Sequence, residues 1–156
     1  MALKERLSLP QEAATWPGEL PVQSLYTAGA AGDRFLKTLK EKGQLLGASC
    51  SRCDEVYVPP KLYCEKCMGE LTEWIKVGPA GTLESWTELH VGLDGQQLDK
   101  PQLVGLILLD GATTSIVHRL SGEPECLCIG MKVTAVLKPP AKREGAITDI
   151  LYFEPK

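Results

Sequence analysis

Apolar and polar residues follow different patterns in three successive segments of this chain. Residues 1–31 carry three prolines among scattered apolar side chains, a pattern too broken for a long helix and too apolar for a solvated tail. Residues 32–77 combine one helical pattern with short strand patterns, and residues 78–156 are dominated by strand patterns. We therefore expect an extended N-terminal arm, a helix with a small β-unit, and an all-β domain, in that order.

The arm formed by residues 1–31 has two interpretations. It is either a disordered terminus or an extended segment that packs Trp16 and several leucines against another surface, such as a partner chain. The second interpretation is supported by the apolar content, because a tryptophan left exposed on an arm is a liability for a soluble protein.

A short helix is predicted at the start of the second segment. Asp33 is its expected N-cap and Gly43 is the residue expected to end it. One face of this helix carries the apolar residues Phe35, Leu36 and Leu39.

Strand patterns are found at residues 45–48 and 71–77, and five more follow in the last segment. The five later strands are predicted at residues 81–91, 103–109, 113–120, 131–137 and 146–153. Asp110-Gly111 is a strong turn signal between the second and third of them. Five strands with a long connection between the third and fourth are typical of a five-stranded Greek-key barrel of the oligomer-binding (OB) type. The predicted fold is therefore mainly β.

Four of the six cysteines form two Cys-x-x-Cys pairs, Cys50 with Cys53 and Cys64 with Cys67. Each pair lets two sulfur atoms point to the same side of a tight turn. Two such turns placed face to face make a tetrahedral cage of four sulfurs, which suits Zn²⁺. The arrangement predicts a zinc ribbon. Because four thiolates fill the coordination sphere, the zinc should be structural and not catalytic.

Three other uses of these cysteines compete with zinc. Two disulfides would need an oxidising compartment, which no secretory signal indicates. A redox dithiol would need its own active-site surroundings around each pair. An iron site of the rubredoxin type shares the same four-thiolate cage, so the ligands alone leave zinc and iron both open.

The charge balance bears on the expected partners. The chain has 156 residues, a formal net charge of −3 and only two phenylalanines. A general nucleic-acid binder would carry a basic balance and aromatic rings for base stacking. No apolar run is long enough to cross a bilayer. We expect a cytoplasmic protein that binds neither nucleic acid nor membranes.

One basic loop could contact a ligand. Lys138, Lys142 and Arg143 fall within six residues in the loop expected beside the binding face of an OB barrel. These groups could hold phosphates by charge-assisted hydrogen bonds, or they could only keep a hairpin tip soluble.

Other chemically active residues do not form a recognisable catalytic set. His118 with Arg119 is expected to be a packed pair at a strand end. Cys126 and Cys128 are expected to be buried as small hydrophobic residues. We expect no independent active site.

Several stretches together resemble a known family. They are GQLLGASCSRCDEVYVPPKLYCEKC after the helix, then a Trp-bearing strand, GPAGTLESWT, and IGMKVTAVL near the end. These stretches are similar to the acyl-CoA-associated OB-fold proteins that carry an N-terminal rubredoxin-like zinc ribbon, from about Asp33 to the C-terminus. The resemblance implies a helix and rubredoxin-like zinc ribbon followed by a five-stranded OB-fold barrel.

The resemblance also implies a function. Members of this family look like non-catalytic accessory subunits of thiolases, in which the barrel docks on the partner and helps to build the channel for the CoA pantetheine arm. We therefore expect a scaffold subunit of a heteromeric thiolase acting on acyl-CoA. The alternatives are an accessory subunit of an acyl-CoA hydratase or condensing enzyme, and an OB-fold module that binds nucleic acid.

Overall fold

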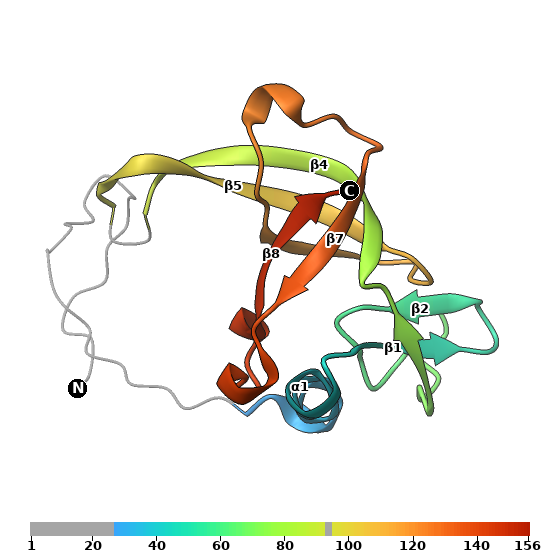
Figure 1. Cartoon of the computed structure of the whole chain (residues 1–156). Coiled ribbons are helices and arrows are strands. Elements are labelled where there is room, and N and C mark those ends of the chain that lie inside the picture. Colours follow the sequence, from blue (N-terminus) through green and yellow to red (C-terminus); the bar gives the residue numbers. More distant parts are fainter. Residues whose placement is uncertain (1–26, 93–94) are drawn as a thin grey trace, which may run out of the picture.

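The computed structural model describes residues 27–92 and 95–156 (Figure 1). Most of the expected arm therefore lies outside the described residues. Within them the elements are one α-helix, eight strands and three short 3₁₀ turns. In chain order they are α1 (Gly29–Lys42), β1 (Leu45–Cys50), β2 (Glu55–Tyr57), β3 (Glu73–Val77), β4 (Ala80–Val91), β5 (Gln97–Leu109), β6 (Ser115–Arg119), η2 (Pro124–Cys126), β7 (Lys132–Leu137), η3 (Pro140–Lys142), η4 (Ile147–Asp149) and β8 (Ile150–Pro155).

Helix α1 begins earlier than its sequence pattern predicted. Its N-cap is Ala28, which provides no side-chain cap, so the prediction that Asp33 caps the helix is wrong. Asp33 instead lies inside the helix, where its carboxylate forms an ion pair with Lys37 at 2.7 Å. The predicted end is confirmed. Gly43 adopts a left-handed φ of 61°, and its backbone N–H donates to the carbonyl oxygen of Leu39.

The strands form two sheets. The smaller sheet has the order β2-β1-β3 and contains the cysteine cluster, and the larger sheet has the order β6-β5-β4-β7-β8. A parallel bridge from Leu120 to Phe153 joins the two edges of the larger sheet, and the N–H of Ser121 donates to the carbonyl oxygen of Phe153 at 2.8 Å. This order and closure are those of a five-stranded OB barrel, as the sequence predicted.

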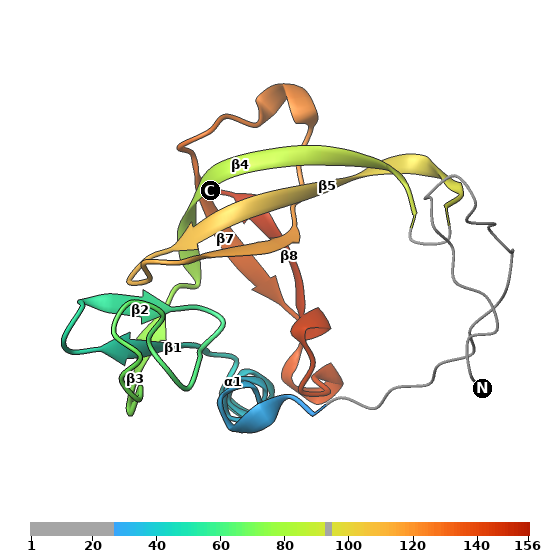
Figure 2. The same cartoon turned by 180° about the vertical axis from the view of Figure 1, so that it is seen from behind.

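Two strand boundaries differ clearly from the prediction. β5 begins at Gln97 and not at Leu103, because β4 and β5 continue as a long two-stranded ribbon beyond the barrel (Figure 2). The last strand begins at Ile150 and not at residue 146, because residues 147–149 form the turn η4. The connection between β4 and β5 is therefore shorter than the predicted strands at residues 81–91 and 103–109 implied.

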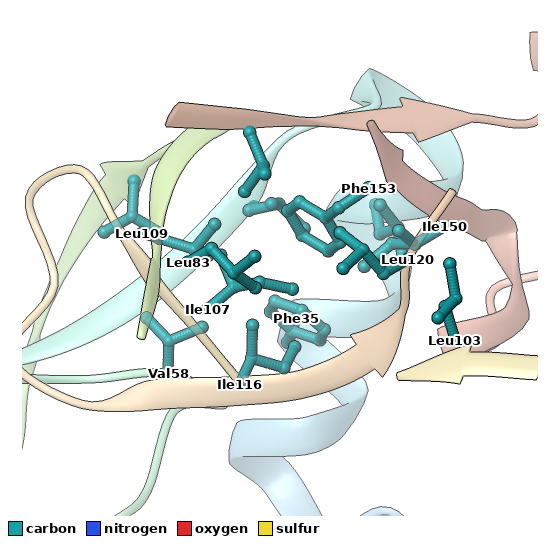
Figure 3. Packing of buried hydrophobic residues seen from close by; sticks show 14 of the residues in the cluster. Phe35, Val58, Leu83, Leu103, Ile107, Leu109, Ile116, Leu120, Ile150 and Phe153 are labelled. Atoms are coloured by element: carbon teal, nitrogen blue, oxygen red, sulfur yellow. The ribbon is translucent and has the colours of Figure 1, made fainter. Parts of the chain in front are cut away.

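The larger of two hydrophobic cores runs from the helix through the zinc-ribbon sheet into the barrel (Figure 3). Phe35 and Leu39 of α1 pack in it together with side chains of both sheets. Its buried members are Phe35, Leu39, Leu45, Val58, Val77, Leu83, Leu103, Ile107, Leu109, Ile116, Leu120, Leu127, Val133, Ile150 and Phe153. Burial of these side chains is the main force that holds the ribbon and the barrel together.

Hydrogen bonds from two threonines also join the two sheets. The turn between β5 and β6 reaches β2, where the Thr113 hydroxyl accepts from the N–H of Val56 at 2.8 Å. The Thr114 hydroxyl accepts from the N–H of Val58 at 2.7 Å. The Thr113 N–H also donates to the carbonyl oxygen of Val56 at 3.0 Å, so the barrel turn covers the outer edge of the ribbon sheet with backbone and side-chain hydrogen bonds.

Asp149 is the one fully buried charged side chain among the described residues. Its carboxylate accepts backbone N–H bonds from Glu144, Gly145 and Ala146, and the Lys138 ammonium lies 3.4 Å from its Oδ1. Burial by itself raises the pKa of this carboxyl, but the backbone donors and Lys138 outweigh it, so the pKa lies below its ordinary value. The carboxylate therefore fastens the loop between β7 and β8.

We predict that Asp149→Asn lowers the free energy of unfolding by about 2–3 kcal/mol at neutral pH, because three backbone donors and one ammonium lose a charged acceptor. A carboxyl with a depressed pKa stabilises the fold above its unfolded-state pKa, and this contribution is lost as pH falls through the folded-state pKa. The difference between wild type and variant should therefore shrink on acidification. Urea unfolding at a series of pH values measures it.

Asp110→Asn is the matched control, since Asp110 is half exposed and pairs with Lys132 on the surface. Its effect should stay within about 0.5 kcal/mol at every pH. A difference for Asp149→Asn that is equally large in acid would contradict the assigned charge interaction.

Candidate metal centre

The four cysteines are brought together by two similar turns. Cys50 ends β1, and the N–H of Cys53 donates to its carbonyl oxygen at 3.3 Å. In the second turn the N–H of Met68 donates to the carbonyl oxygen of Cys64 at 2.9 Å. In each turn the residue after the second cysteine adopts a left-handed conformation, with φ of 53° at Asp54 and 54° at Met68.

The four sulfur atoms fit a tetrahedral zinc ion. The Sγ atoms of Cys50, Cys53, Cys64 and Cys67 all lie within 4.8 Å of one another. Cys50 Sγ and Cys67 Sγ are 3.7 Å apart. A tetrahedron with Zn–S bonds of about 2.3 Å has sulfur–sulfur edges of about 3.8 Å, so the observed spacing matches the ion. The cluster is a structural zinc site, as the sequence predicted, with no coordination position left for a substrate.

Tyr57 is a supporting residue that the cysteine spacing does not reveal. Its side chain is buried, and its hydroxyl oxygen lies 3.4 Å from Cys64 Sγ while accepting the N–H of Glu65 at 3.2 Å. The hydroxyl can therefore donate its proton to the sulfur. This hydrogen bond is the largest of several that together lower the pKa of the Cys64 thiol to about 6; the backbone N–H groups of Cys67 and Lys66 add to it. No local motif marks such a residue, because the contact depends on how β2 faces the second turn.

Close contacts among the sulfurs raise the pKa of another metal ligand, Cys53. The hydrogen bond with Cys67, followed by burial, raises the pKa of the Cys53 thiol to about 12. A bound divalent cation reverses this tendency, because it favours the thiolate form of every ligand. Lys66 lies inside the second turn, but its ammonium pairs with Glu55, and Glu55 also accepts from Thr113. The charged network thus links the cluster to the barrel turn.

We predict that Tyr57→Phe weakens zinc binding about tenfold at neutral pH, as removal of a hydrogen bond to a metal ligand typically does. The loss of the hydroxyl raises the pKa of Cys64, so protons displace zinc at a higher pH than in the wild type. A colorimetric zinc chelator, titrated over a range of pH, measures the midpoint of release.

Tyr63→Phe is the control, because Tyr63 is an exposed tyrosine in the same loop. Elemental analysis of the wild-type protein first establishes that the bound metal is zinc and not iron. An unchanged release midpoint in Tyr57→Phe would refute the role of the hydroxyl.

The basic loop is only partly available for a ligand. The Lys138 ammonium is paired with Asp149 at 3.4 Å and with Glu144 at 3.9 Å. Arg143 Nε donates to the carbonyl oxygen of Lys138, and its guanidinium lies against Gly43 at the end of α1. The ammonium of Lys142 forms no ion pair among the described residues and is exposed. The three residues thus share a loop, but Lys138 and Arg143 contact other groups of the protein and only Lys142 is exposed.

Other candidates fall in different places. His118 is half-buried, and its ring meets Phe153 edge-on with centroids 5.9 Å apart, so it packs at a strand end as expected. Arg119, expected to pack with it, is exposed instead. The expectation that Cys126 and Cys128 are buried is wrong, since both are exposed. Leu127 between them is buried instead, because the extended backbone at this residue turns its neighbours to the opposite side. Trp74 packs under Arg34 of α1, with 4.5 Å from the guanidinium carbon to the ring centroid.

No described helix is long and apolar enough to cross a membrane. This finding concerns only the part of the chain that the structure describes.

Two family models match the chain in succession. Residues 39–72 match the rubredoxin-like zinc ribbon domain of ChsH2, and residues 74–138 match the C-terminal OB-fold domain of ChsH2. Together they cover the cysteine cluster and most of the barrel.

Two related proteins are named DUF35 domain-containing scaffold proteins. The one from Methanocaldococcus jannaschii is 28% identical over 125 residues, which are 78% of this chain and 89% of the relative. The one from Methanothermobacter thermautotrophicus is 23% identical and covers 79% of this chain and 95% of the relative.

Two solved structures share the fold at 22% identity. A DUF35-family protein of unknown function from Sulfolobus solfataricus has a TM-score of 0.60 and covers 82% of this chain and 85% of its own. A chain of the Ltp2–ChsH2(DUF35) aldolase has a TM-score of 0.57, and the match covers 78% of this chain and 91% of that one. The protein therefore carries the two ChsH2-type domains, a rubredoxin-like zinc ribbon and a C-terminal OB-fold domain, and is a homologue of the DUF35 scaffold proteins.

Proposed function

We propose that this chain is a non-catalytic scaffold subunit of a heteromeric enzyme that acts on CoA thioesters, with a thiolase-type acyltransferase as its partner. The observation that carries the proposal is the pairing of a coordinatively closed zinc ribbon with an OB barrel in a homologue of proteins named as scaffolds. On this view the catalytic nucleophile and the acid–base residues belong to the partner.

The outer face of the barrel supports a partner contact. Strand register places Leu89, Val104, Leu106 and Val117 on one side of β4, β5 and β6. We call these four residues the outer apolar face. Val117 is 64% exposed and Leu89 is 42% exposed. A shallow groove of about 260 Å³ runs along Val104, Leu106 and Val117. Apolar side chains gathered on one face are typical of a surface that another protein covers.

Two further features belong to the same proposal. The apolar N-terminal arm, residues 1–26 of which lie outside the described part, is proposed to pack against the partner. A cytoplasmic location is supported by the use of four thiolates as metal ligands, which a reducing compartment preserves.

The alternative partner is an aldolase, because one solved relative is named Ltp2–ChsH2(DUF35) aldolase. A thiolase partner predicts carbon–carbon cleavage that consumes free CoA and forms a second thioester, or the reverse condensation that releases CoA, whereas an aldolase partner predicts carbon–carbon cleavage that consumes no CoA and leaves one thioester intact. Purification of the natural complex and assay of both reactions separates the two.

We predict that Val117→Asp weakens the complex with the partner by at least about tenfold, because a carboxylate on the outer apolar face has to be desolvated on docking. Removal of residues 1–26 should weaken it as well. Analytical ultracentrifugation of the co-expressed subunits measures the affinity.

Ile129→Asp is the control, since Ile129 is 72% exposed on the loop between η2 and β7 and is not one of the residues of the outer apolar face. The proposed docking surface is wrong if both substitutions have the same effect. The scaffold role itself is wrong if the wild-type chain stays a separate species with every thiolase or aldolase encoded beside it, or if the chain alone turns over acyl-CoA.

The basic loop is proposed to contact CoA phosphates, mainly through Lys142. We predict that Lys142→Glu raises the KM of the complex for acyl-CoA several-fold with little change in kcat, since a lost phosphate contact affects ground state and transition state alike. Steady-state kinetics at low ionic strength measures this. Lys37→Glu on the exposed side of α1 is the control, and an equal rise in KM would contradict the contact.

A further inference from the structure

A second concave site lies where the barrel wall is incompletely closed. β6 and β8 are joined by the bridge from Leu120 to Phe153, and no further ladder pairs connect them. On one side of this bridge the two strand edges separate and leave a cavity of about 440 Å³. In Figure 2 the turns that precede β8 lie beside α1 at the lower end of the barrel. This site is separate from the zinc cluster and from the outer apolar face, although Val104 borders both concavities.

The lining of the cavity divides into an apolar part and a basic part. Its apolar surface comes from aliphatic side chains, namely Val104, Ile147, Ile150 and Leu151. Its charged groups are Arg119 and Lys138, and no carboxylate lines it. Asp149 and Glu144, at 3.4 and 3.9 Å, already offset the charge of Lys138, but Arg119 forms no ion pair among the described residues. The cavity therefore keeps one uncompensated positive charge beside an aliphatic wall.

His118 adds an unsatisfied polar atom to the same wall. Its Nε2 lies 3.4 Å from the carbonyl oxygen of Ile147, so Nε2 carries the proton that is donated. Its Nδ1 is buried and has no hydrogen-bond partner among the described residues. A buried acceptor without a partner is costly, but a carboxylate has no proton to donate to it, so this atom does not select the charged group of a ligand.

We propose that this cavity binds a small organic anion, a carboxylate attached to an aliphatic chain. Arg119 would bind the carboxylate beside the already paired Lys138, and Ile147, Ile150 and Leu151 would cover the chain. The volume falls within the range of about 300–1,000 Å³ that is usual for small-molecule sites. Guanidinium and ammonium groups bind carboxylates through charge-assisted hydrogen bonds, which fixes the orientation of such a ligand. The inference does not depend on the scaffold role.

The test uses the full-length, zinc-loaded chain and octanoate as the probe, with amide chemical shifts as the readout. We expect saturable shifts at Thr148 and Leu151. Octanol, which has the same chain without the charge, should bind at least about tenfold more weakly. Arg119→Gln should weaken octanoate binding about tenfold, whereas Lys100→Gln on the exposed β4–β5 ribbon should leave it unchanged.

Leu151→Trp provides a second variant, because a larger side chain fills the cavity without removing a charge. It should abolish octanoate binding while the zinc content stays the same. The proposal is overturned by the absence of saturable shifts, by equal affinity for octanol and octanoate, or by an equal loss in Arg119→Gln and Lys100→Gln. Circular dichroism and zinc content verify that each variant is folded.

Discussion

Tetrahedral coordination by four thiolates is the constraint on which the N-terminal half of this fold depends. The ribbon sheet has only a small core of its own, formed by Ala48, Tyr57 and Leu71 around the cysteines. A core of this size is too small to order two tight turns and a three-residue strand. A metal that draws four sulfurs to within 4.8 Å of one another supplies the missing free energy, on the order of 10 kcal/mol in small zinc-binding peptides.

The ribbon in turn completes the barrel. Val58 and Val77, which flank the metal turns in the chain, belong to the same core as the barrel residues Leu109 and Ile116. The threonine pair in the β5–β6 turn then fastens to β2 by hydrogen bonds to its backbone. Because these contacts cross from one unit to the other, the metal site influences the position of the barrel without touching its outer surface. This arrangement suits a rigid scaffold, whose surfaces must keep a fixed relation to one another.

Backbone pairing is less complete at the end of the barrel that carries the loop between β7 and β8. There the strand edges separate, and the loop between β7 and β8 is held by one buried carboxylate rather than by a ladder of backbone pairs. Asp149 satisfies three backbone N–H groups and anchors Lys138, which also lines the cavity beside it. The incomplete closure therefore leaves a concave and basic site, while the buried charge keeps its rim ordered.

The sequence by itself determined the metal ligands, the order of the two domains and the five barrel strands, because ligand spacing, turn residues and strand alternation are local properties of the chain. It failed where the outcome depends on distant contacts. Asp33 is of a residue type favoured at helix N-caps but lies inside the helix, and Cys126 and Cys128 are exposed because Leu127 takes the buried position. The pairing of Lys138 with a carboxylate eleven residues away is likewise not visible in the sequence. The tertiary structure alone decided these positions, along with the roles of Tyr57 and the cavity at His118, since each depends on which elements pack face to face and not on the neighbours in the chain.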